Sequence, residues 1–307
     1  MRQGSLAQST DVTAPFAAEL CGYRPTNGNP STSDNNDKGS IELGHALFEA
    51  LGVPKGTPGV EDIGSAMEQK VADHLSKVRP DLVVAQSRSA IEFEQYKHLN
   101  VFKTFTKNYK GPAGELDKIL AELPESPELK PVRTRLLKAK TASERDHELV
   151  TQLQEMMPEE SFLKIDVALA PPEPADRLLV ALSSKWSLRT DRAQDCVSQG
   201  SKLVSLRRGH MPHYAVVTME PRPAMLKYLA YGSGAVDCVY HLALPELLEA
   251  TDAIDRKRGP KGWSPRKVLL RMVAQRRVRP YEDLVAEVQR LTAWNYSPSA
   301  DAPDGAN

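Results

Sequence analysis

One aspartate in this sequence lies inside an apolar segment, where a buried charge is costly unless it has a task. Asp166 belongs to the run Leu163–Ala170, which alternates in the manner of a β-strand. After a proline-rich turn, a second apolar segment ends in Ser183, Ser184 and Lys185. If the two segments pair as antiparallel strands, Asp166 and Lys185 lie side by side at one edge of a sheet.

An acidic and a basic side chain at such an edge suit the metal-assisted hydrolysis of a phosphodiester. The carboxylate of Asp166 would hold a divalent cation that polarises the phosphoryl oxygen and lowers the pKa of water. Lys185 would orient or activate that water. A structural ion pair explains the two residues equally well, so the spacing alone does not decide between these interpretations.

A second group of charged residues follows directly. Arg189, Asp191 and Arg192 lie where a strand should end and a helix begin. The arginine fork matches the O6 and N7 atoms of guanine, and a carboxylate can accept a hydrogen bond from N4 of cytosine. These three residues, called the reading motif below, could recognise G·C base pairs close to Asp166 and Lys185. The alternative is a salt-bridge cluster that caps the helix, with Thr190 or Asp191 as the capping residue.

Three other features have both a structural and a functional interpretation. Glu68 lies between the small residues Gly64 and Ala72 on one helix face, which leaves room for a ligand beside its carboxylate, although a surface glutamate is the commoner case. The pair His210 and His213 flanks a strand without a nearby cysteine pair, and we interpret it as ordinary. Cys196 and Cys238 are interpreted as small core residues.

The elements that must position these residues alternate between strands and helices in the middle of the chain, which favours a mixed α/β domain. We expect strands at 163–170, 178–187, 213–220 and 235–242, and helices at 41–51, 61–78, 191–206, 223–231, 245–256, 265–274 and 281–291, with 91–157 mostly helical. Proline residues lie at several of the expected helix ends. We find no internal repeat and no convincing linker, so a single domain is the default.

The domain organisation that we expect has three parts. Residues 1–39 are rich in Ser, Thr, Asn, Gly and Pro and should form a flexible segment with a possible DNA-contacting loop. Residues 40–295 should form one domain, with a helical insertion at about 105–160 and the catalytic hairpin and reading helix at 163–209. Residues 296–307 should be a disordered tail.

Composition excludes several classes of protein. The 307 residues contain 40 Lys and Arg against 40 Asp and Glu, so a globally basic nucleic-acid coat is excluded, although a local basic patch is not. Basic residues concentrate at 185–209 and 256–279, and acidic ones exceed basic ones at 115–163. The three cysteines are too few for a disulfide framework, and no apolar run reaches the roughly 20 residues of a membrane span. We expect a cytoplasmic protein without membrane contact.

Three longer strings carry a resemblance to a known family. The runs SSKWSLRTDRAQ, GHMPHYAVVTMEP and GSGAVDCVYHLALPEL, at 183–194, 209–221 and 232–247, resemble restriction endonucleases of the NgoMIV type. Weaker similarity surrounds Glu68 and Ser87–Leu99. The resemblance implies a restriction-endonuclease-like core of the PD-(D/E)XK superfamily, with a mixed central β-sheet flanked by helices.

The same resemblance implies roles for particular residues. Asp166 corresponds to the metal-binding aspartate and Lys185 to the catalytic lysine, with Ser183 two positions before it. The backbone carbonyl of Ser184 would be a further metal ligand, and Glu68 matches an auxiliary glutamate. The reading motif corresponds to the residues that recognise a CCGG core.

An activity and partners are implied as well. We expect Mg²⁺-dependent cleavage of double-stranded DNA at a palindromic site, with GCCGGC the favoured target and 5′-phosphate ends with a 5′ overhang. A two-fold target implies a homodimer, and the resemblance extends this to a homotetramer. A restriction enzyme also implies a cognate DNA methyltransferase in the same system.

The sequence departs from the family pattern at three points. Ile165 stands where a proline is usual, and the spacing between Asp166 and Lys185 is short, which implies a trimmed loop. More seriously, Gln199 stands in place of a glutamate on the helix that follows, which keeps a carbonyl ligand but loses a charge. Asp195 or Glu68 could substitute for it. The alternative function is a catalytically weakened or inactive protein that binds specific DNA without cutting it.

Overall fold

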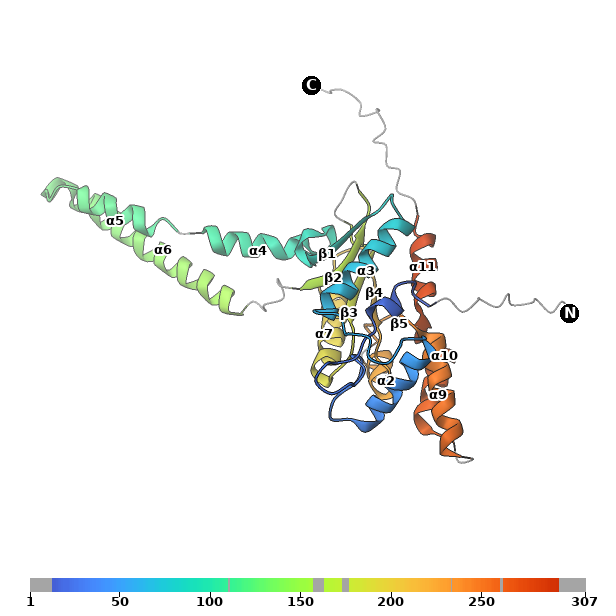
Figure 1. Cartoon of the computed structure of the whole chain (residues 1–307). Helices are drawn as coiled ribbons and strands as arrows, with labels where there is room; N and C mark the ends of the chain where they lie inside the picture. Colours follow the sequence, from blue (N-terminus) through green and yellow to red (C-terminus); the bar gives the residue numbers. More distant parts are fainter. Residues whose placement is uncertain are drawn as a thin grey trace, which may run out of the picture.

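The computed structural model describes residues 13–109, 111–156, 163–172, 177–232, 234–259 and 262–292. Among these, a body that contains a sheet carries a long helical projection, which we call the arm and define as residues 97–156 (Figure 1). The expected tail at 296–307 and the first twelve residues lie outside the described ranges. No helix in the described ranges is long and apolar enough to cross a membrane.

Six strands form a single mixed sheet in the order in which they occur along the chain. They are β1 (Val83–Ser89), β2 (Lys164–Ala170), β3 (Val180–Lys185), β4 (His213–Thr218), β5 (Cys238–His241) and β6 (Val278–Pro280). The pairs β1–β2 and β2–β3 are antiparallel, whereas β3 to β6 are parallel. The expected α/β class is confirmed, and so is the antiparallel hairpin of β2 and β3.

Helices pack on the sheet, connect its parallel strands and form the arm. They are α1 (Ala17–Leu20), α2 (Lys38–Ala50), α3 (Ile63–Val78), α4 (Lys97–Asn108), α5 (Ala113–Glu122), α6 (Lys130–Met156), α7 (Thr190–Leu206), α8 (Pro223–Tyr231), α9 (Leu244–Arg258), α10 (Ser264–Ala274) and α11 (Tyr281–Arg290). The helices α7 and α8 follow β3 and β4 and contact each other, whereas α3 packs against β1, β2 and β3 and contacts α11. Parallel strands need such crossover helices, because a tight turn cannot join them.

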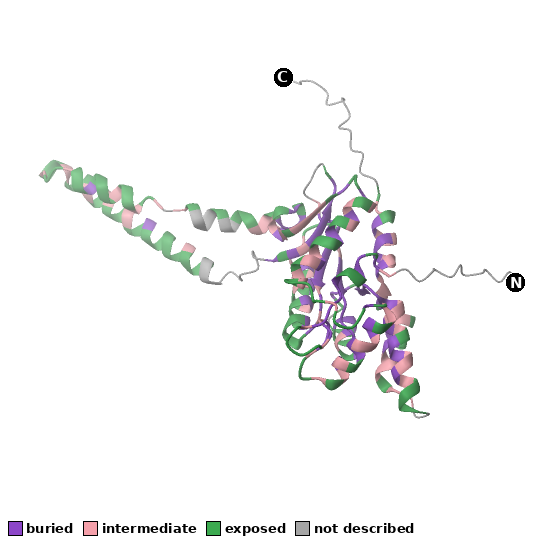
Figure 2. Ribbon diagram, in the orientation of Figure 1, coloured by how far each residue is buried: buried purple, intermediate pink, exposed green. Residues whose placement is uncertain are grey.

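The core is the central part of the sheet together with the inner faces of these helices (Figure 2). The strands β3, β4 and β5 are buried over almost their whole length, as expected for parallel strands covered on both faces. On α3 the buried residues Met67, Val71 and Leu75 follow one another at a spacing of four, which confirms the apolar stripe predicted from the sequence.

Residues 13–39 do not form the flexible segment that their composition suggested. Phe16, Ala17 and Leu20 are buried, and Ala14 bonds through its backbone to Leu242 next to β5. The Asp37 carboxylate accepts hydrogen bonds from the first backbone N–H groups of α2, so this helix begins before residue 41. The expectation is wrong for these residues because a few apolar side chains anchor an otherwise polar segment to the core.

Candidate functional site

The start of β2 and the end of β3 bring four polar residues together at one end of these neighbouring strands: Asp166, Ser183, Ser184 and Lys185. The register pairs Val167 with Leu182, which brings the start of β2 next to the end of β3. One oxygen of Asp166, Oδ2, accepts hydrogen bonds from the Ser184 backbone N–H at 2.8 Å, from Lys185 Nζ at 2.7 Å and from Ser183 Oγ at 3.2 Å. The juxtaposition that the sequence predicted is therefore present.

The pair of Asp166 and Lys185 is only partly shielded from solvent. Their side chains are 13% and 21% exposed, so the ion pair lies at the surface of the core rather than within it. Burial alone would lower the pKa of Lys185, but the Asp166 carboxylate and, more weakly, Glu68 raise it above its ordinary value. Lys185 consequently carries a full positive charge at neutral pH.

Glu68 reaches the same region from α3. Its carboxyl group is half-buried, and burial raises its pKa, with the nearby negative charge of Asp166 as the next contribution. Lys185 and Lys164 oppose this shift. Two carboxyl groups that repel each other across a cleft form a site that favours a bound cation, because the cation would relieve the repulsion.

Glu68, Ser184 and Lys185 line a cleft of about 1030 Å³, which several separate segments of the chain enclose. Asp166 contacts two of these lining residues, Ser184 and Lys185. The segments contribute Arg24, Ser31, Ser33 to Asn36, Gly59 to Gly64, Glu68, Ser184 to Arg189, Arg192, Asp195 and Arg222. Arginine and lysine side chains thus alternate with carboxylates around the opening. The mixture suits an anionic ligand together with a cation, rather than an apolar small molecule.

Arg189 and Arg192 of the reading motif line this cleft, whereas Asp191 does not. Arg189 is the residue before α7, and Asp191 and Arg192 occupy its first turn. All three are exposed, and none of them forms a side-chain hydrogen bond or ion pair with any residue that the structure describes. The capping interpretation is wrong, since the start of α7 has no side-chain cap. The three side chains are free to contact a ligand.

Gln199 is not among the residues that line the cleft. Its Nε2 donates to the Lys164 carbonyl oxygen at 3.1 Å, and its Oε1 accepts from the Tyr214 hydroxyl at 3.3 Å. Asp195, one turn earlier on α7, does line the cleft. The structure therefore brings together Asp166, Ser183, Ser184, Lys185 and Glu68, but not Gln199.

Two residues at the end of β4 were missed by the sequence analysis. Glu220 is fully buried beside the cleft, and Arg222 lines it. A signal was present, because Glu220 is a charged residue two positions after the apolar strand β4, and the segment between them continues to be apolar at Met219. The proline residues on both sides of Arg222 suggested only a turn.

The donor set is compatible with Mg²⁺ at this site. Mg²⁺ is commonly held by one or two carboxylates, with water and substrate phosphate oxygens as the other ligands. Asp166 Oδ1 accepts no hydrogen bond from the described residues, and Ser184 and Glu68 add further oxygen atoms nearby. The described residues contain no group of three or more His, Cys, Asp and Glu side chains that could hold a metal ion without such additional ligands.

Comparisons with known proteins identify a family and a relative of this chain. A family model described as NgoMIV restriction enzyme matches residues 30–288. A curated relative, the type II restriction enzyme NgoMIV of Neisseria gonorrhoeae, is 33% identical over 242 residues, which cover 74% of this chain and 80% of the relative.

Proposed function

Because the chain belongs to the NgoMIV restriction enzyme family and is a site-specific deoxyribonuclease, we propose that it cuts duplex DNA at a palindromic CCGG core, most readily at GCCGGC. The products would be 5′-phosphate ends with a 5′ overhang. The observation that carries this proposal is the cleft, where Lys185, paired with Asp166, and the unpartnered Arg189 and Arg192 of the reading motif line one opening.

Each polar group at the site has a distinct task in this proposal. Lys185 carries the positive charge that contacts the scissile phosphate and orients the attacking water. Asp166 keeps that ammonium group in place and, through the Ser184 N–H, fixes the end of β3. Ser183 supports the same Asp166 oxygen. Mg²⁺, when bound by Asp166 with the Ser184 carbonyl, supplies Lewis-acid activation of the phosphoryl oxygen and of water.

The reading motif supplies the sequence specificity. Arg189 and Arg192 present guanidinium groups that match the O6 and N7 atoms of guanine, and Asp191 can accept from N4 of cytosine. The Ser31–Asp37 loop, called the N-terminal loop below, shares the cleft with the reading motif, as does the turn at 60–62. We assign contacts with the outer base pairs to these two segments.

The proposal includes partners. A palindromic target is read by at least a homodimer, in which each subunit contacts one half-site, and two such dimers would form a homotetramer. Self-protection of the host DNA requires a cognate methyltransferase in the same system. With duplex DNA as its substrate, the proposed enzyme would act in the cytoplasm.

One observation favours a second candidate, a protein that binds its site but cuts slowly or not at all. Gln199 lacks the charge of the family glutamate, and its amide group is engaged outside the cleft. In this alternative Asp195 does not replace the missing carboxylate.

Plasmid cleavage separates the two candidates. Purified protein is incubated with Mg²⁺ and a plasmid that carries one or two GCCGGC sites, and the ends of any fragments are sequenced. We expect cuts within GCCGGC, and no cuts after EDTA treatment or in a plasmid whose sites have lost the CCGG core. Specific binding without cleavage would support the second candidate, and cuts elsewhere would contradict the proposed site.

A further inference from the structure

A fully buried carboxylate at the end of β4 has no task in the reaction described above. The Glu220 side chain is 0% exposed. Its Oε1 accepts from the Arg222 backbone N–H at 2.9 Å and from Arg222 Nε at 2.7 Å. Its Oε2 accepts from the Leu188 backbone N–H at 2.7 Å and from Arg222 Nη2 at 3.2 Å. Both carboxylate oxygens are therefore fully engaged.

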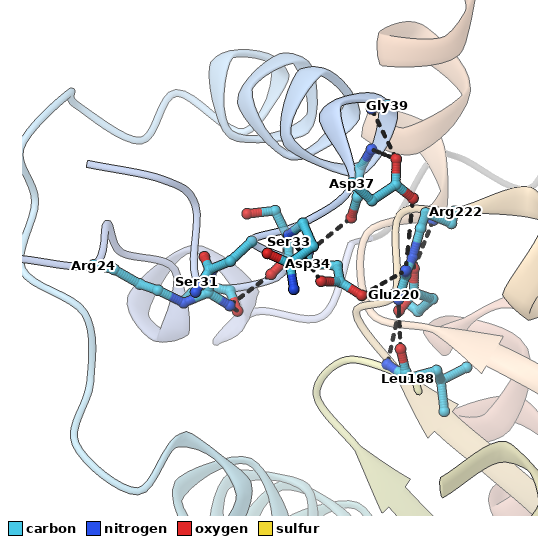
Figure 3. Close-up of polar contacts among 12 residues, drawn as sticks. Arg24, Ser31, Ser33, Asp34, Asp37, Gly39, Leu188, Glu220 and Arg222 are labelled. Atoms are coloured by element: carbon cyan, nitrogen blue, oxygen red, sulfur yellow. Dashed lines mark hydrogen bonds and ion pairs between the residues drawn. The ribbon is translucent and has the colours of Figure 1, made fainter. Parts of the chain in front are cut away.

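Glu220 and Arg222 together hold both polar groups of one peptide residue. Glu220 accepts the N–H of Leu188, and Arg222 donates to the carbonyl oxygen of the same residue (Figure 3). Leu188 immediately precedes Arg189, the first member of the reading motif. The backbone direction at the start of the motif is consequently set by a side-chain pair from another strand.

The other end of Arg222 contacts the N-terminal loop. Its Nη1 lies 3.4 Å from an Asp34 carboxylate oxygen and 3.7 Å from one of Asp37 (Figure 3). Asp37 in turn caps α2, and Arg24 donates to the Ser33 carbonyl oxygen at 2.6 Å. A continuous polar network thus connects the reading motif to the loop that shares its cleft.

The charge balance of this network makes Glu220 its central member. Burial raises the pKa of the Glu220 carboxyl group above its ordinary value, while the Arg222 guanidinium opposes that shift. Without Glu220, Arg222 would lose its best partner and would be free to turn towards Asp34 and Asp37 alone. Breaking one side of a buried pair is strongly destabilising, because the other charge loses its compensation.

We propose that Glu220 is a positioning residue for sequence recognition. Through Leu188 and Arg222 it fixes the position of the reading motif relative to the N-terminal loop, so that both segments contact their base pairs at the same time. This role rests on the proposed function. It extends that function by assigning part of the sequence specificity to a residue that does not itself contact the DNA. Rigid support of this kind increases discrimination, because a recognising side chain that can move also tolerates wrong partners.

The test compares Glu220→Gln with wild type in steady-state cleavage of two oligonucleotides, one with GCCGGC and one with a single changed base pair in the CCGG core. We expect the ratio of the two kcat/KM values to fall by about tenfold or more, since a displaced bidentate base contact loses discrimination of that order. The change should appear mainly in KM for GCCGGC, with kcat little affected, because Asp166 and Lys185 are not in contact with Glu220.

Glu246→Gln serves as the matched control. Glu246 in α9 is also partly buried and also binds the N-terminal segment, through Thr13, but it does not line the cleft. Its replacement should leave the ratio unchanged. If Glu220→Gln is folded, judged by thermal unfolding, and discriminates as wild type does, the inference is wrong. If wild type itself neither cuts nor binds GCCGGC, the proposed function fails instead.

A double-mutant cycle covers the case in which Glu220→Gln does not fold. Leu188 and Arg222 remain in place when the loop end of the network is cut by Asp34→Asn, Asp37→Asn or both. A positioning network predicts that these changes also lower the discrimination ratio, and that Glu220→Asp, which keeps a carboxylate but shortens its reach, lowers it as well. Additive effects of Glu220→Asp and Asp37→Asn on the ratio would overturn the inference, since coupled residues give non-additive changes.

Discussion

The two oxygens of the Asp166 carboxylate have different surroundings. Oδ2 accepts from three donors, Lys185 among them, whereas no described residue donates to Oδ1. A purely structural ion pair would not need the Ser184 N–H and the Ser183 hydroxyl on the same oxygen. The arrangement fixes Lys185 and leaves Oδ1 without a hydrogen-bond donor among the described residues.

Removal of the lysine should separate cleavage from binding. We expect Lys185→Ala to lower the rate of GCCGGC cleavage by at least about a hundredfold, the order of effect of a positioned proton-transfer group. Affinity for the same site, measured by gel shift in Ca²⁺, should stay within a few-fold of wild type. Lys227→Ala, an exposed lysine on α8, is the control. Cleavage that survives in Lys185→Ala would show that the active site is misplaced.

The position of Gln199 leads to a prediction that the sequence alone did not support. Since its side chain faces the Lys164 carbonyl and Tyr214, Gln199→Glu should raise the cleavage rate no more than a few-fold. Asp195→Asn should lower the rate by about tenfold or more, because it removes a carboxylate that lines the cleft. Single-turnover rates at saturating Mg²⁺ measure both. A large gain from Gln199→Glu would place residue 199 in the active site.

The position of the Asp166–Lys185 pair could be predicted from the sequence, whereas the position of Gln199 could not. Asp166 and Lys185 were found because strand pairing places the start of one strand beside the end of the next, whatever the rest of the fold does. Which turn of α7 faces the cleft depends on how the helix packs on β4, and the Tyr214 ring and Gly200 decide that. No local pattern in the sequence contains this information.

At the level of elements, the strands that were missed are the outer ones. The edge strand β1 is largely polar, with Gln86, Ser87 and Arg88 in succession, and it does not alternate. Ser87 has a positive φ of 53° and does not pair with β2, although Gln86 and Arg88 on either side of it do. The strand is therefore interrupted as well. The strand β6 has only three residues. Both exist because a buried neighbouring strand supplies hydrogen-bond partners, which is a tertiary effect.

The packing of α7 on β4 can be tested through a glycine. A Cβ atom at Gly200 would lie 2.7 Å from the Tyr214 ring and 2.9 Å from the Ala235 carbonyl oxygen. We expect Gly200→Ala to lower the free energy of unfolding by about 1–3 kcal/mol, as overpacking does. Gly114→Ala on α5, with nothing within 4 Å, should be neutral or stabilising by up to about 1 kcal/mol. Urea unfolding of both variants measures the difference, and equal effects would contradict it.

A second prediction at this level concerns the contact between β4 and β5. Burial would lower the pKa of His213. Its interactions with Asp237 and with the adjacent residue Cys238 nevertheless raise this pKa from 6.5 to about 9. Because the pKa is higher in the folded state, the stabilisation is complete below about pH 6.5 and is lost as the pH rises through 9.

We therefore expect the free energy of unfolding to fall between these pH values, by at most about 3–4 kcal/mol at about 1.4 kcal/mol for each pKa unit. Urea unfolding measured across this range tests the expectation. Asp237→Asn should flatten the dependence. A wild-type curve as flat as that of the variant would show that His213 is not stabilised by Asp237.

For the whole molecule, the zero net charge is the sum of regions with different tasks. Part of the acidic excess at 115–163 falls on α5, through Glu115, Asp117 and Glu122, on the arm and away from the sheet, whereas α6 carries more basic than acidic residues (Figure 1). The cleft keeps its arginine and lysine residues beside a few carboxylates. Such a distribution limits indiscriminate attraction to DNA, since non-specific affinity grows with the number of phosphate contacts.

The arm is nearly independent of the core. Between residues 97 and 156 only Leu120 and Ser143 are buried among the side chains that the structure describes, and α5 packs mainly against α6. The rings of Tyr109 and His147 stack with their centroids 6.2 Å apart, so the chain leaves and returns through neighbouring points. A short linker can join these points, because each residue of an extended linker spans about 3.3 Å.

Replacement of residues 111–145 by a short Gly/Ser linker should therefore leave the body intact. We expect the thermal unfolding temperature to change by only a few degrees, because the deletion exposes little of the core, and cleavage of GCCGGC to continue with the same specificity. A variant that keeps the arm but carries Lys185→Ala controls for contaminating nucleases. Loss of cooperative unfolding would show that the arm is part of the core. Loss of cleavage with retained folding, together with a smaller mass by light scattering, would show instead that subunits of the active enzyme associate through the arm.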